Sequence, residues 1–365
     1  MRHLLAGLLG LAVLAPVWAD DKAAETPKTP AEKFDALQKA CDKEMAKFGE
    51  EHMKAKTAEQ RAKIEEQALK VVAGQYAKKM MAIADESPKD PVAIKALMWV
   101  CINGYRTDLA PDALARLLKD HPEIQQLALV CRYLQRRPDG ETLIRDVRTK
   151  TTDKVVKIQA GIFLAGMIRD KNDPVSAEKA EKLLEEVVAE AKQAGTDVPA
   201  RTVAQAEDDL KDVRVFGAGK PAPAAEAKDL DDKNVALADL KGKVVVLDFW
   251  ATWCGPCKSM IPHERDMVKK LAGKPFAFVS VSADDKVETV KEFVDKEPMP
   301  WTHWFAGKSG EVLKNWNIHA FPTIYVIDGK GVIRGKFIGA GSDTEKKLEA
   351  LVEKLVSESD GKGVE

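Results

Sequence analysis

The sequence predicts an all-α domain followed by an α/β domain with a mixed sheet. From about residue 31 to 213, apolar side chains recur at spacings of three and four residues, which is the period of amphipathic helices. After residue 227, short apolar runs alternate with helical patterns, which is typical of a sheet with helices on both faces. Residues 214–226 are rich in Gly, Pro and Ala and are expected to link the two domains.

The first residues have the pattern of a secretory signal peptide. Arg2 and His3 form a positive start, and the run 4–17 is apolar. In Val17-Trp18-Ala19 the first and last residues are the small side chains at the two positions recognised for cleavage. We therefore expect residues 1–19 to be removed from an exported protein, periplasmic or otherwise extracytoplasmic. An uncleaved anchor is the alternative, but the run is shorter than the ~20 residues of a spanning helix. Residues 20–30 and 359–365 are expected to be a disordered leader and tail.

Composition excludes several classes of function. The chain has 57 basic and 58 acidic residues, so no basic excess is available to neutralise nucleic-acid phosphates. Its five cysteines are too few for a disulfide-stapled scaffold. A single C-x-x-C lacks the second ligand pair of a zinc finger, so we expect no metal, and no cofactor beyond a redox-active disulfide. No second apolar run is long enough for a stable membrane span.

The helical region, residues 31–213, carries a weak repeat of thirty residues. Apolar positions of one helix recur in a later one, as Ile94, Leu97 and Val100-Cys101 and then Ile124, Leu127 and Val130-Cys131. This spacing predicts a solenoid-like stack of helix pairs, with an ordinary helical bundle as the alternative. Cys101 and Cys131 occupy equivalent positions and are expected to be buried thiols, because packed helix axes lie about 8–10 Å apart, too far for an easy disulfide.

After a first short strand, the second domain is expected to have the order βαβα followed by ββα. Strands are predicted at residues 234–240, 243–249, 276–282, 323–327 and 331–338, and helices at 256–271, 286–296 and 343–356. The Asp328-Gly329 pair is the signal for a hairpin between the last two strands.

A dithiol follows the strand at 243–249, in the sequence Trp253-Cys254-Gly255-Pro256-Cys257. Free backbone N–H groups at the start of a helix carry positive partial charge, which favours the thiolate of the first cysteine. The thiolate is the form that attacks disulfides. The pattern therefore predicts a redox site at the junction of strand and helix.

The segment from Phe249 to Cys257 resembles the active-site sequence of thioredoxin-fold proteins, and more closely that of exported thiol-disulfide oxidoreductases of the TlpA/ResA type. The resemblance extends from about Asp229 to Val356. It implies that residues 227–358 form a thioredoxin-like domain and that the protein is an enzyme, a thiol-disulfide oxidoreductase. It also implies that Cys254 is the nucleophile and Cys257 the resolving cysteine.

Asp248 lies six residues before Cys254, on a strand where an apolar residue would be expected. The resemblance implies that it is the buried acid that accepts the proton of the resolving cysteine, and burial would raise its pKa. A structural carboxylate at the strand end is the alternative. Thioredoxins pair this acid with a lysine on the next strand, but the run 276–282 contains none.

Phe321-Pro322 precedes the strand at 323–327 and resembles the family's cis-proline loop, which faces the dithiol and binds substrate. A trans proline opening an edge strand is the alternative. Together with this loop, we expect substrate contacts from Trp250, Trp253, Gly255, Pro256 and Phe321. Three further tryptophans are expected mainly in the core, with a hydrophobic substrate platform as the alternative reading: Trp301, Trp304 and Trp316.

The leading functional prediction is an exported enzyme that reduces or exchanges disulfides of protein substrates through Cys254 and Cys257. Pro256 cannot donate a backbone hydrogen bond, and fewer donors near the sulfur favour a reductant, which needs an upstream thiol electron donor. One alternative is a peroxiredoxin-like peroxidase on the same fold, although the Pro-x-x-x-Thr-x-x-Cys arrangement is missing here. The other is a helical-repeat binding or scaffold protein with a secondary redox domain.

Overall fold

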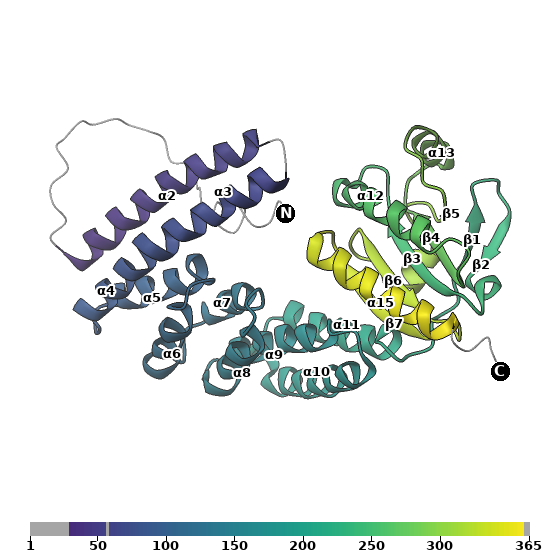
Figure 1. Cartoon of the computed structure of the whole chain (residues 1–365). Helices are drawn as coiled ribbons and strands as arrows, with labels where there is room; N and C mark the ends of the chain where they lie inside the picture. The colour runs from purple at the N-terminus through teal and green to yellow at the C-terminus, as the bar shows by residue number, and fades with distance from the viewer. Residues whose placement is uncertain (1–28, 56–57, 361–365) are drawn as a thin grey trace. The chain divides into compact units, whose positions relative to one another are not determined.

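The structure is a computed structural model that describes residues 29–55 and 58–360 (Figure 1). The expected signal peptide, residues 1–19, and most of the expected leader lie outside these residues. The chain forms two compact units. The first holds the residues up to Leu164 together with Ala194–Pro199, and the second holds Ala165–Gln193 and Ala200–Glu365. The units therefore divide inside a helix of the α-helical region rather than at residue 213.

The first unit is helical, as predicted. Its helices are α2 (Pro30–Lys54), α3 (Ala58–Val71), α4 (Lys78–Glu86), α5 (Pro91–Asn103), α6 (Ala110–Asp120), α7 (Leu127–Leu134), α8 (Gly140–Lys150) and the first part of α9 (Lys154–Arg169), with a π-helical turn at Val72–Ala77. Thr29 caps α2 because its hydroxyl accepts from the Glu32 N–H while the Glu32 carboxylate accepts from the Thr29 N–H. Successive helices pack against each other, including α5 on α6 and α7 on α8. The thirty-residue sequence repeat stays a prediction.

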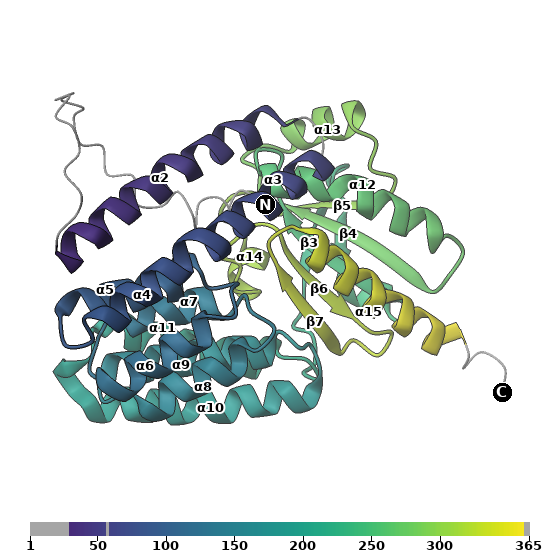
Figure 2. The ribbon, with the colours of Figure 1, turned by 60° about the vertical axis from the view of Figure 1, so that its left-hand side comes forward.

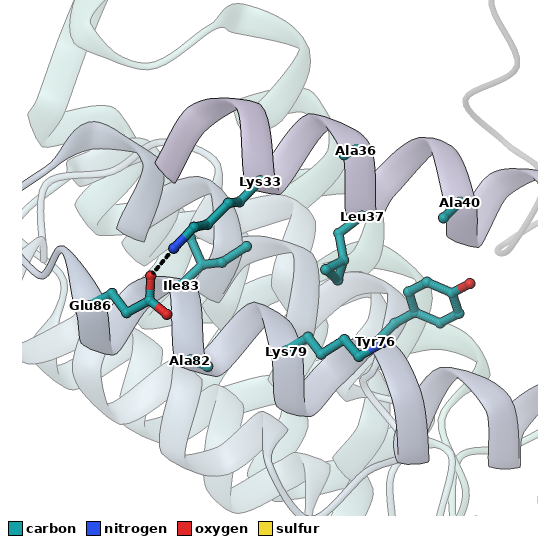
Figure 3. A pocket seen from close by; sticks show the side chains of 9 residues that line it. All are labelled: Lys33, Ala36, Leu37, Ala40, Tyr76, Lys79, Ala82, Ile83 and Glu86. Atoms are coloured by element: carbon teal, nitrogen blue, oxygen red, sulfur yellow. Dashed lines mark hydrogen bonds and ion pairs between the residues drawn. The ribbon is translucent and has the colours of Figure 1, made fainter. Parts of the chain in front are cut away.

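Cys41, Cys101 and Cys131 are free thiols buried among these helices, as expected for the last two. Burial raises the pKa of each thiol to about 12, so each stays protonated at neutral pH. A groove of about 500 Å³ runs between α2 and α4 (Figure 3). The Lys33–Glu86 ion pair (2.6 Å) lies at one end of this groove and Tyr76 at the other.

The second unit contains a seven-stranded mixed sheet in the order β2-β1-β5-β4-β3-β6-β7. The strands are β1 (Glu226–Asp229), β2 (Asn234–Ala236), β3 (Val244–Trp250), β4 (Phe276–Ser282), β5 (Thr302–Phe305), β6 (Thr323–Ile327) and β7 (Ile333–Ile338). Strands β3, β4 and β5 are parallel, and β6 is antiparallel to both β3 and β7. The helices are α10 (Pro174–Ala194), α11 (Ala200–Phe216), α12 (Gly255–Lys270), α13 (Val287–Lys296), α14 (Glu311–Asn315) and α15 (Ser342–Asp360).

Strand β3 is buried along its whole length, so its alternate side chains pack into two separate cores. Val244 and Val246 face α12 and α15 and pack with Met260 and Leu348. Leu247 and its neighbours Val245 and Phe249 face the opposite way, in a cluster with Trp316 and Tyr325. Figure 2 shows α15 lying over the sheet beside β6 and β7, which it contacts.

Helix α11 ends in the core of this unit, because Phe216 packs in the cluster that contains Phe249, Trp316 and Tyr325. Residues 214–216 of the expected linker are therefore helical. After Phe216 the chain bonds to the β6–β7 hairpin, where the Ala222 N–H donates to the Gly331 carbonyl (2.8 Å). Helices α10 and α11 thus belong to the same unit as the sheet, which is why the compact division falls earlier than residue 213.

Candidate active site

The dithiol lies where β3 ends and α12 begins. Cys254 is the N-cap residue of α12, and its Sγ accepts a hydrogen bond from the Cys257 N–H (3.2 Å). The two cysteines form a disulfide with an S–S distance of 2.09 Å. Because α12 is a 16-residue helix with its positive end at this sulfur, its N-terminus favours the Cys254 thiolate once the disulfide is reduced.

In the disulfide form Cys254 is only 4% exposed, like Cys257. Both pack in a cluster with Trp250, Ile261 and Met299. Gly255 and Pro256, in contrast, are exposed beside the disulfide. A Cβ added at Gly255 would meet no other atom within 4 Å, so the surface at this point is open.

The Phe321–Pro322 peptide bond is cis, which confirms the predicted isomer. Pro322 is buried, and its carbonyl accepts from the Gly339 N–H (2.9 Å). The next residue, Thr323, pairs with Phe249 of β3, so the loop lies beside the strand that leads to the dithiol. Phe321 meets the Trp253 ring edge to face, with centroids 5.7 Å apart, and Trp253 is 64% exposed.

Trp250 does not lie at the surface as the predicted substrate contact would require. It is 1% exposed and packs edge to face against Phe293 of α13. The reason is the alternation of β3, which turns Trp250 into the core beneath α12 and α13. Trp304 and Trp316 are also buried, at 1% and 0% exposure, in agreement with the core reading.

Asp248 is buried in β3, as predicted, at 2% exposure. Its Oδ2 accepts from the Ser280 hydroxyl (3.3 Å), and its Oδ1 has no partner among the residues that the structure describes. Burial raises the pKa of Asp248 to about 7, while the Ser280 hydrogen bond acts in the opposite direction. This carboxyl group can therefore take up and release a proton near neutral pH.

Sequence reasoning missed a second buried carboxyl group, Glu264 of α12, which is 3% exposed. Its pKa is raised well above the usual value, first by burial and then by the negative charges of Asp248 and Glu345. The signal was present in the sequence, because Glu264 shares the helical spacing of the buried Met260 and Met267. Asp284, which follows β4, was also missed; it is 1% exposed and bonds Thr252 in the active-site turn.

Within residues 29–55 and 58–360, no group of three or more His, Cys, Asp or Glu side chains is arranged to hold a metal ion. Over the same residues, no helix combines the length and the apolar character that crossing a membrane requires.

A mixed sheet with helices on both faces, a disulfide at the start of a helix and a cis-proline loop together define a thioredoxin-fold thiol-disulfide oxidoreductase. Residues 217–352 match the Redoxin family. The thiol-disulfide oxidoreductase ResA of Bacillus thuringiensis subsp. konkukian is 32% identical over 137 residues, which cover 38% of this chain and 78% of that protein. The chain belongs to the ResA-type thiol-disulfide oxidoreductases.

Other relatives match the same part of the chain. Thioredoxin-like protein YneN of Bacillus subtilis is 35% identical over 134 residues, which cover 36% of this chain and 76% of that protein. Among solved structures, a putative thiol:disulfide interchange protein DsbE from Chlorobium tepidum is 29% identical and has a TM-score of 0.37, with 39% of this chain and 99% of that chain covered. The Redoxin match leaves the helices up to α11 outside it.

Proposed function

We propose that this protein is an exported enzyme that reduces or exchanges disulfides of protein substrates, with Cys254 as nucleophile and Cys257 as resolving cysteine. The observation that carries the proposal is the position of Cys254, whose sulfur caps α12 and accepts the Cys257 N–H. This geometry favours a thiolate at Cys254 in the reduced enzyme. Cys257 lies within the first turn of the same helix, so the two sulfurs can rejoin.

The reaction then has two exchange steps. The Cys254 thiolate attacks one sulfur of a substrate disulfide, and the other substrate sulfur leaves as a thiolate. Cys257 next loses its proton to Asp248, attacks the Cys254 sulfur and displaces the second substrate sulfur as a thiolate. Two electrons pass from the dithiol to the substrate, and the enzyme ends with the Cys254–Cys257 disulfide. A thiol electron donor has to reduce that disulfide before the next cycle.

The surface around the disulfide supports a protein substrate. Trp253, which precedes Cys254, forms an aromatic edge with Phe321. Gly255 and Pro256, which follow Cys254, are exposed, and the space around Gly255 is open. Aromatic rings supply a large contact area for an extended chain that carries a disulfide. In this proposal Pro322 shapes the loop that holds Phe321 in place.

Export is supported by the signal-like pattern of residues 1–19, which precede the first described helix. Outside the cytoplasm, a dithiol is oxidised unless a donor keeps it reduced. The reductase therefore requires an upstream thiol donor in the same compartment.

The test is reduction of insulin disulfides by the full-length mature protein. Cys254→Ser should abolish the activity, because no thiolate remains at the start of α12. Cys257→Ser should trap a mixed disulfide between Cys254 and the substrate, visible as a covalent adduct by mass spectrometry. Cys41→Ala removes a buried free thiol in the first unit and should keep the wild-type rate. Full activity of Cys254→Ser would overturn the proposed function.

A further inference from the structure

Three polar side chains form a buried row across the sheet. Asp248 of β3 pairs in register with Ser280 of β4, and Ser280 pairs with His303 of β5. They are 2%, 0% and 8% exposed, on the face of the sheet that α12 and α15 cover. Burying a polar group without a hydrogen bond costs free energy, so each of these three side chains is expected to have a hydrogen-bond partner.

The hydrogen bonds along the row have a direction. Trp301 Nε1–H donates to Ser280 Oγ (2.8 Å), and the Ser280 hydroxyl is 3.3 Å from Asp248 Oδ2. An indole N–H can only donate, whereas a hydroxyl group has one hydrogen to give. Since Ser280 accepts from Trp301, its own hydrogen is available for Asp248 Oδ2. Oδ1 of the same carboxyl group has no partner in the described part of the chain.

Asp248 lies beneath the first turns of α12. On its face of β3 the neighbours are Val246 and Trp250, two residues away on either side. Val246 belongs to the cluster that contains Met260, and Trp250 belongs to the cluster that contains Cys257. The Asp248 carboxyl group therefore lies on the face of the sheet covered by α12, the helix that carries Cys257.

Other titratable groups face this site from the packed elements. Glu264 and Cys257 lie on α12, and the charge of Glu345 on α15 acts on Glu264. His303 on β5 contacts the Met299 carbonyl through its Nε2 (3.0 Å), and its Nδ1 has no hydrogen-bond partner among the described residues. Glu264 is therefore the neighbour whose charge must be separated from the effect of Ser280.

We propose that Ser280 and Trp301 are positioning residues that hold Oδ2 of Asp248 and leave Oδ1 to accept the proton of Cys257. Strand β4 contains no lysine, so it supplies no positive charge to the Asp248 carboxylate. The proposal rests on the proposed function and names the groups that set its resolving step. In that step the proton moves from Cys257 Sγ to Asp248 Oδ1, the sulfur electron pair forms the bond to Cys254, and the substrate sulfur leaves as a thiolate.

The experiment mixes the reduced full-length enzyme with a peptide disulfide and measures, from pH 5 to 9, the rate at which Cys257 releases the peptide from its mixed disulfide with Cys254. Ser280→Ala removes the donor to the carboxylate, so the pH midpoint of the rate should rise by about one unit. Trp301→Phe keeps the ring but frees the Ser280 hydroxyl, and should raise the midpoint by about half a unit. Ser280→Thr restores a hydroxyl and should return the midpoint to that of the wild type.

Two controls separate this role from loss of packing. Trp304→Phe removes an indole N–H on the opposite face of β5 and should leave the midpoint unchanged. Glu264→Gln keeps the shape of α12 and tests the neighbouring carboxyl group; Ser280→Ala should raise the midpoint in this background as well. Identical midpoints for the wild type, Ser280→Ala and Trp301→Phe would overturn the inference while the proposed function stands. Absence of peptide release by the wild type at every pH would overturn the proposed function itself.

Discussion

Asp284 accepts two hydrogen bonds from Thr252, one from its backbone N–H (3.0 Å) and one from its hydroxyl (2.6 Å). The Ser282 hydroxyl donates a third bond to the same carboxylate (2.8 Å). Thr252 stands two residues before Cys254, so the loop after β4 fixes the turn that carries the dithiol. A carboxylate that accepts several bonds in a buried place is among the stronger hydrogen-bonding arrangements in proteins.

Replacing Asp284 by Ala should lower the free energy of unfolding by about 1–3 kcal/mol, because the polar groups of Thr252 and Ser282 lose their acceptor. Urea unfolding of the disulfide form gives this value. Asp285→Ala is the matched control, since the neighbouring Asp285 is exposed and lies 4.0 Å from Lys308 at the surface. Equal unfolding midpoints for the two variants would show that Asp284 does not hold the turn.

The buried Asp248 should make stability depend on pH. In an unfolded chain an aspartate has a pKa of about 3.9, whereas burial raises the pKa of Asp248 to about 7 in the folded protein. Between these values the folded state binds more protons than the unfolded state. The contribution of Asp248 to the free energy of unfolding is therefore fully present below about pH 4 and is lost as the pH rises to about 7.

Asp248→Asn removes this carboxyl group. The variant should be more stable than the wild type at pH 8 by about 4 kcal/mol, and the difference should shrink toward pH 4. Chemical unfolding of the oxidised protein at a series of pH values measures both. Asp266→Asn, at an exposed position of α12, should follow the wild type. If the Asp248→Asn and wild-type curves run parallel, Asp248 does not titrate in this range.

The ion pair between Asp212 and Lys336 ties α11 to β7. Lys336 Nζ lies 2.7 and 2.9 Å from the two carboxylate oxygens, Asp212 is buried, and the Lys336 side chain is only 11% exposed. Burial lowers the pKa of Lys336, while the charge of Asp212 and its hydrogen bond act in the opposite direction. Lys336 also lies over the rings of Phe216 and Tyr325.

Asp212→Ala should destabilise the protein by about 3–5 kcal/mol, because Lys336 is left buried without its partner. The double variant Asp212→Leu with Lys336→Met should recover most of that loss. Glu178→Ala breaks an exposed pair with Lys182 on α10 and should leave the unfolding midpoint nearly unchanged. If Asp212→Ala had the same unfolding midpoint as the wild type, α11 would not contribute to the folding of the second unit.

Much of the second unit could be predicted because its strands are short apolar runs. The range 276–282 is observed as β4, and 323–327 as β6. The missed strands β1 and β5 are four residues long and half-buried, so their sequence has little alternation to detect. The integration of α11 was also missed, because one aromatic residue, Phe216, and one charged residue, Asp212, make contacts that sequence spacing does not reveal.

The cysteines stand out by their spacing at the end of a strong strand, whereas Asp248 and the cis isomer of Pro322 were indicated by the resemblance to thioredoxin-fold proteins. Trp250 could not be assigned correctly, since a motif gives no information on which face of the strand a side chain takes. The hydrogen bond between Ser280 and Trp301 could not be predicted from the sequence, because it joins residues 21 positions apart and depends on the register of β4 and β5.

Trp253→Ala should raise the KM for a protein disulfide by roughly 2–10-fold, because loss of an aromatic contact is worth about 0.5–1.5 kcal/mol. The reaction with a small aliphatic disulfide should change little, since such a substrate cannot reach the edge formed with Phe321. Val175→Ala, at an exposed apolar position of α10, serves as the control. An equal loss with both substrates would place the effect on the dithiol rather than on binding.

We propose that the Cys254–Cys257 pair donates electrons to protein disulfides. The most direct test of this proposal is the reduction potential of this pair in the full-length mature protein, equilibrated with glutathione or dithiothreitol buffers and quantified by thiol alkylation. Because Pro256 offers no N–H to the sulfurs, we predict a potential close to that of thioredoxin, about −270 mV. A potential close to that of DsbA, about −120 mV, would contradict it and define an oxidant.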